Sequence, residues 1–114
     1  MQLCVFWPWG NQKNTHTQSI FFIEPFTNGN HQPARHEDIP ALELLLPRIK
    51  VMGEKLLGTA FHTIELNRAE GRLELSLTKG VVNSHHRDMF RRFRGWIECF
   101  AVEIAVQTQS RLTA

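Results

Sequence analysis

The side chains best suited to chemistry begin with two pairs of histidines. His31 and His36 stand in one polar stretch, and His85 and His86 are adjacent further along the chain. Imidazoles bind zinc when three or four ligands converge on one point. Neither pair has the H-x-x-x-H spacing that puts two imidazoles on one face of a helix. We therefore expect solvated histidines, no metal site and no bound cofactor, and keep a metal site formed by these four histidines as a minor alternative.

Nucleophilic catalysis has as little support. Cys4 and Cys99 lie far apart with no C-x-x-C spacing, and no serine stands in a G-x-S-x-G elbow. Gly53 and Gly58 have the outer spacing of a phosphate-binding loop, but Thr59 stands where the phosphate-binding lysine is needed. The sequence therefore predicts a protein that is not an enzyme, with free thiols and a cytoplasmic location.

The segment 87–94 holds four arginines and one aspartate, a local charge of +3 in a chain whose net charge is +2. Arginines next to aromatic residues can bind phosphates and RNA bases. The same pattern also describes the solvated back of a helix that packs on a core. A nucleic-acid-binding regulator is therefore our alternative hypothesis, and it uses Arg87, Arg91, Arg92 and Arg94.

The bulk composition agrees with one globular domain spanning residues 1–114. Hydrophobic residues make up 42% of the 114 and charged residues 21%, which is ordinary globular usage. No apolar run approaches the ~20 residues that a membrane-spanning helix needs. The N-terminus has neither the basic start nor the small-residue cleavage site of a signal peptide. We expect no membrane partner.

Alternating apolar residues predict four strands. The first two are Leu3–Trp7 and Ser19–Ile23. The second is apolar on both faces, which predicts a central position in the sheet, and it is expected to end at Pro25. The next two lie around His62–Leu66 and Leu73–Leu77, and the short segment between them ends in Gly71, as hairpin loops do. Residues 27–38 read as one long loop.

Two helices complete the pattern. Leucines at helical spacing predict a helix from Leu42 to Leu57, with Gly58 as its cap and a kink or division at Pro47. The last helix is predicted from about Ser84 to Val106, with an aromatic stripe on one side. The order ββαββα predicts an α+β fold: a two-layer sandwich of a mostly antiparallel sheet with two helices on one face.

A thin sandwich leaves one sheet face uncovered, and we expect a protein partner or a second copy of the chain to cover it. This makes a protein-binding adaptor or regulator, forming a homodimer, the leading hypothesis. The expected contact residues lie on the sheet and on the first helix: Phe6, Phe21, Ile23, Leu42, Leu45, Leu46 and Ile49.

The second half of the chain resembles a known family. FHTIELNRAEGRLELSLTKG (61–80) followed by MFRRFRGWIECFAVEI (89–104) is similar to the C-terminal half of the type III secretion chaperones and chaperone-like regulators. That resemblance implies a non-enzymatic α/β dimer that binds an extended segment of a secreted or regulatory protein. This chain departs from the family by beginning with a predicted strand and by being mildly basic.

Overall fold

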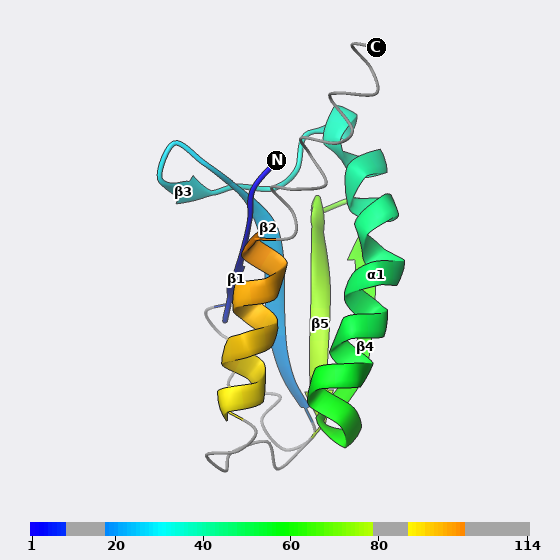
Figure 1. The fold of residues 1–114 in the computed structure, drawn as a ribbon. Coiled ribbons are helices and arrows are strands. Elements are labelled where there is room, and N and C mark those ends of the chain that lie inside the picture. Colours follow the sequence, from blue (N-terminus) through cyan, green and yellow to red (C-terminus); the bar gives the residue numbers. More distant parts are fainter. Residues whose placement is uncertain (9–17, 79–86, 100–114) are drawn as a thin grey trace, which may run out of the picture.

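The computed structural model describes residues 1–8, 18–78 and 87–99 (Figure 1). The main strands pair antiparallel in the order β1-β2-β5-β4. Their bounds are Leu3–Phe6 for β1, Gln18–Thr27 for β2, Phe61–Asn67 for β4 and Arg72–Thr78 for β5. The short β3, Asn30–His31, pairs with the end of β2.

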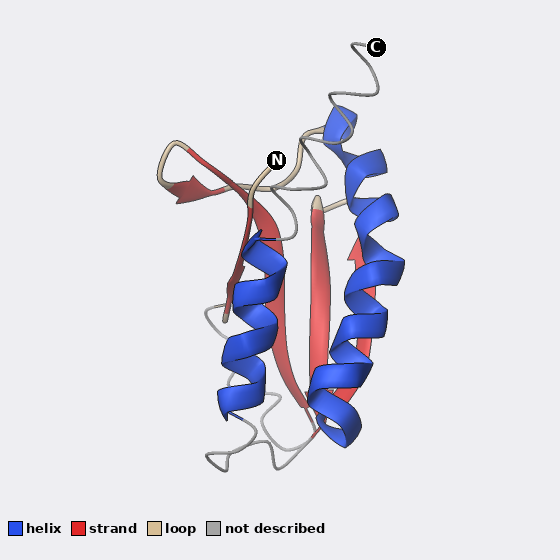
Figure 2. Cartoon of the chain, viewed as in Figure 1, coloured by secondary structure: helices blue, strands red, loops and turns tan. Residues whose placement is uncertain are grey.

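Two helices pack against one face of this sheet (Figure 2). Helix α1 spans Ile39–Leu57, and helix α2 is described for residues 87–99. The predicted α+β class is therefore confirmed, as is the central position of the second strand, because β2 lies between β1 and β5. The ends of the predicted last helix, including Ser84 and Val106, fall outside the described residues.

The core lies between the sheet and the helices. Leu73, Leu75 and Leu77 alternate inward along β5, and Ile23 faces them from β2. Phe93 and Ile97 of α2 reach the same layer and are fully buried. Phe21 packs on Phe90 with the ring centres 4.5 Å apart, which ties α2 to the sheet.

Strand β2 continues through Pro25, so the expected end of this strand there is wrong. The carbonyl of Pro25 accepts a bond from the Gln32 N–H, whereas the Phe26 N–H points the other way, to the Gln2 carbonyl. The ladder with β5 has already ended at Ile23. The N–H that proline lacks would thus lie on the side that β5 no longer occupies, so no ladder bond is lost.

Helix α1 continues through Pro47, which excludes a division of the helix there, one of the two expected outcomes. A proline inside a helix costs about 3 kcal/mol. Burial of Leu42, Leu45 and Ile49 under the same helix is worth about 1.5–3 kcal/mol for each side chain. The free energy gained by burying these three side chains therefore exceeds the cost of the proline. The predicted cap is confirmed: Gly58 has φ 55° and donates its N–H to the Glu54 carbonyl.

Candidate partner-binding surface

The structure separates the histidines that the sequence grouped. His31 lies on β3, where its Nδ1 is 3.2 Å from the Glu24 carboxylate, and His36 is exposed just before α1. His85 and His86 lie outside the described residues. Within the described ranges, no group of three or more His, Cys, Asp or Glu side chains could hold a metal ion.

The open face of the sheet carries aromatic rings that already have partners. Phe6 and Phe22 face each other on β1 and β2, with their ring centres 5.7 Å apart. His31 stacks on Phe6 at 3.9 Å, and the guanidinium carbon of Arg72 lies 3.6 Å from the centre of the Phe22 ring. Both rings are only half-exposed. This face is therefore partly closed by the chain itself.

Two carboxylates on the same face stand opposite each other, and the Glu74 carboxylate is held by hydrogen bonds. Glu65 and Glu74 stand directly opposite each other on β4 and β5. The Glu74 carboxylate accepts bonds from Arg72 Nε at 3.0 Å and from Asn67 Nδ2 at 3.2 Å. These two donors therefore occupy the Glu74 carboxylate. The arrangement is that of a hydrogen-bonded strand surface.

Cys4 lies beside Glu24 on this face, and its surroundings suppress its reactivity. Burial raises the pKa of the Cys4 thiol to about 11, with the Glu24 carboxylate acting in the same direction. The Sγ atom is 3.5 Å from the Glu24 carbonyl oxygen, to which the thiol donates. A thiol protonated at neutral pH is a poor nucleophile. Both Cys4 and Cys99 are free.

The residues expected to bind a partner fall into three groups in the structure. Those in the core are Ile23, Leu42, Leu45 and Ile49, which are buried and present no surface. Phe21 and Leu46 are half-buried against the core. Only Phe6 lies on the open sheet face, under His31. Both faces of β2 are apolar, so the sequence could not assign Phe21 and Ile23 to the correct one.

A different set of apolar residues lies on the solvent side of α1. Pro40, Leu44, Pro47 and Val51 are all exposed, Leu44 by 66% and Val51 by 65%. We call these four residues the outer stripe. Their spacing of four, three and four residues places them on one side of a helix. This spacing is visible in the sequence, but Glu43, Lys50 and Glu54 adjoin Pro47 at helical spacing and make the same side of the helix look polar.

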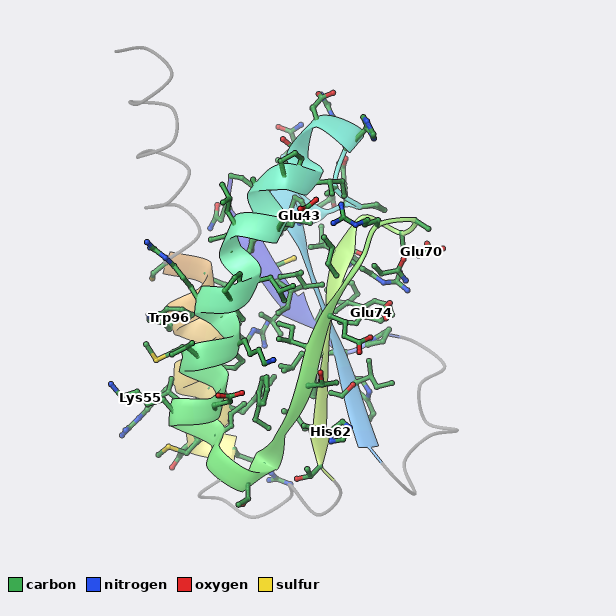
Figure 3. All side chains as sticks on the ribbon, turned by 90° about the vertical axis from the view of Figure 1, so that its right-hand side faces the viewer. Glu43, Lys55, His62, Glu70, Glu74 and Trp96 are labelled. Carbon is green, nitrogen blue, oxygen red and sulfur yellow. The ribbon has the colours of Figure 1, made fainter. Side chains whose placement is uncertain are left out.

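A shallow hollow adjoins the outer stripe and continues to α2. Its volume is about 350 Å³, and it is lined by Pro47, Arg48, Val51, Met52 and Trp96. We call it the helix groove. Figure 3 shows Trp96 and Lys55 on the side of the helices that faces away from the sheet. Among the described residues, Leu44 and Val51 are the two large hydrophobic side chains of this layer that are exposed.

The arginines of α2 lie on its solvent side. Arg87, Arg91, Arg92 and Arg94 are exposed. Arg91 is 3.8 Å from Asp88, and Arg94 is 3.9 Å from Glu98. Phe90 and Phe93 point to the sheet and the core, so they offer no stacking platform next to these arginines. This geometry is that of a solvated helix flank with ion pairs.

Comparison with known protein families, curated proteins and solved structures finds no match for this chain. The chain can therefore be classified by its fold alone, which is an antiparallel sheet with two helices packed on one face. In the described ranges, no helix is long and apolar enough to cross a membrane. Its function has to be argued from the surface of the helix layer.

Proposed function

We propose that the protein is a non-enzymatic adaptor or regulator that binds a segment of another protein at the outer stripe and helix groove. The observation that carries this proposal is that α1 is apolar on two sides. Its inner side fills the core, and its outer side exposes Leu44 and Val51. A surface helix of a monomer normally has one apolar stripe and an opposite polar side.

The size of the surface favours a short segment over a large globular partner. Burying a Leu or Val side chain contributes about 1.5–3 kcal/mol, so the outer stripe and groove can supply useful affinity. Stable globular interfaces, however, bury roughly 800 Å² on each partner. A stripe of four residues beside a hollow of about 350 Å³ fits one helix or peptide better.

The resemblance to type III secretion chaperones and their regulators is compatible with this proposal, because those proteins bind a segment of another protein. It gives the class of function in which we place the chain. A homodimer, the other expectation from the sequence, would have to cover the same stripe with a second copy. The nucleic-acid alternative remains a prediction; Arg91 and Arg94 have acidic neighbours on their own helix.

Co-purification of the tagged full chain tests the proposal. We expect the wild type to retain a protein that Val51→Glu loses, because a buried glutamate opposes docking on an apolar stripe. Trp7→Glu is the matched control, since Trp7 is 52% exposed and follows β1, at the edge of the sheet opposite to β4, on which α1 packs. Retention of the same proteins by Val51→Glu, or no retained protein with any variant, would contradict the proposed surface.

A further inference from the structure

Three cations lie beside the helix groove in the part of the chain that the structure describes. Arg48 lines the groove, and Lys55 lies two turns further along the same flank of α1. On α2, Arg92 precedes Trp96 by one turn. All three cations are exposed, and Figure 3 shows Lys55 on the outer side together with Trp96.

The acidic residues of α1 border the outer stripe on the side opposite to the groove. Glu43 is bonded to Arg68 of the β4–β5 turn, which places it on the side of α1 that faces away from α2. Glu54 follows Glu43 by eleven positions, or three turns, and shares that flank. On the described part of α2, Asp88 lies one turn before Arg92 outside the lining of the groove and is 3.8 Å from Arg91, and Glu98 is 3.9 Å from Arg94. The groove therefore combines an apolar floor with a basic rim.

We infer that the occupant of the helix groove is an amphipathic helical segment whose apolar anchors are flanked by aspartate or glutamate. This inference rests on the proposed function and names the chemistry of its partner. Leu44, Pro47 and Val51 recur at helical spacing along α1. A docked helix can contact all three with apolar residues at its own positions i, i+3 or i+4, and i+7. The acidic flanks of that helix face Arg48, Lys55 and Arg92.

A second copy of the chain fits this surface less well. In a twofold dimer with antiparallel α1 helices the same edges meet, so both basic rims come together. Six cations would then surround one small apolar contact, and like charges across an interface cost binding energy. The acidic flank of α1 that could offset them is turned toward the β4–β5 turn through the Glu43–Arg68 pair. Charge complementarity thus favours an acidic partner over antiparallel self-association.

Selection from a random 16-residue peptide display library on the immobilised full chain tests the inference. We expect enriched peptides with apolar residues at helical spacing and net negative charge, and no such enrichment on Val51→Glu. An enriched peptide, resynthesised, should bind roughly tenfold more weakly to the double variant Lys55→Glu/Arg92→Glu, and its affinity should fall as salt rises. The double variant should instead select peptides rich in lysine and arginine.

Lys50→Glu/Arg87→Glu is the control variant, because it changes net charge equally at positions away from the groove. It should bind the acidic peptide within about twofold of the wild type. Enrichment of neutral or basic peptides by the wild type would overturn the inference and leave the proposed function standing. So would a dimer in light scattering that Val51→Glu dissociates. No enrichment over Val51→Glu would remove both the inference and the proposed surface.

Discussion

The two outer surfaces of the sandwich differ in how far their hydrophobic side chains are covered. On the open face of the sheet, Phe6 and Phe22 each lie under a polar side chain, His31 or Arg72. On the helix layer, Leu44 and Val51 are about two-thirds exposed. The bare sheet face, which the sequence favoured for binding, is thus the more self-contained of the two surfaces.

This difference shows why exposure alone does not identify a binding surface. Apolar atoms make up over half of an ordinary protein surface, so a half-buried ring needs no further explanation. A second apolar stripe on a helix does need one, because it adds nothing to the core. The open sheet face should therefore determine stability, whereas the outer stripe should determine binding.

Phe22→Ala is expected to have the largest effect on stability. Buried phenylalanines cost about 3–5 kcal/mol when cut to alanine, and half-burial reduces the expected loss here to about 2–3 kcal/mol. The change removes the ring that contacts both Phe6 and Arg72. Urea unfolding followed by circular dichroism measures it. A loss below about 0.5 kcal/mol, similar to a surface substitution, would show that this face is not structural.

Gly53→Ala sharpens the same contrast within α1. A β-carbon at Gly53 would come within 2.6 Å of the Phe61 ring and 3.2 Å of Phe93. Overpacking of this kind costs about 1–3 kcal/mol, and the better helix propensity of alanine returns up to about 1 kcal/mol. We expect a net loss of about 1–2 kcal/mol in the free energy of unfolding.

Val51→Ala is the matched control for Gly53→Ala, two residues away on the outer side of α1. Val51 is exposed and packs on nothing in the core, so its truncation should change stability by under about 0.5 kcal/mol. Thermal unfolding of both variants distinguishes the two sides. Equal losses would mean that the outer stripe contributes to folding, against its proposed role in binding.

The sequence predicted the layers of this fold better than its surfaces. The strict alternation of apolar residues from Leu73 to Leu77 predicts a half-buried strand, and the structure has the strand β5 there with these leucines buried. The identity of the bare sheet face was not accessible, because Phe21 and Phe22 are equally apolar and only pairing with β1 and β5 fixes which points inward. The spacing of the outer stripe is visible in the sequence, but a proline at its centre predicts a kink or break and so conceals a continuous apolar side.

Arg72→Ala should give a smaller loss on the sheet face, of about 1 kcal/mol. The guanidinium covers Phe22 and bonds to Glu74, and cation–π contacts at partly exposed sites contribute about 0.5–1 kcal/mol. Repeating the substitution in a Phe22→Leu background isolates the ring contact. The loss should shrink there by roughly half, and an unchanged loss would assign the effect to the Glu74 bond alone.

The smallest expected effect concerns the two thiols, one on each surface. Cys4 on the sheet face has a pKa raised to about 11, whereas Cys99 on α2 is exposed. At pH 8 a disulfide reagent should modify Cys99 quickly and Cys4 slowly, because the thiolate is the attacking species. The Cys4 thiol has a pKa of 9.0 in the unfolded chain and about 11 in the native state. Between these two pKa values the native state binds more protons than the unfolded state, so the free energy of unfolding should fall as the pH rises from 9.0 to about 11. Cys4→Ser should remove this part of the alkaline loss without altering modification of Cys99. Equal modification rates in the wild type at pH 8 would mean that the sheet face is as open as the helix layer.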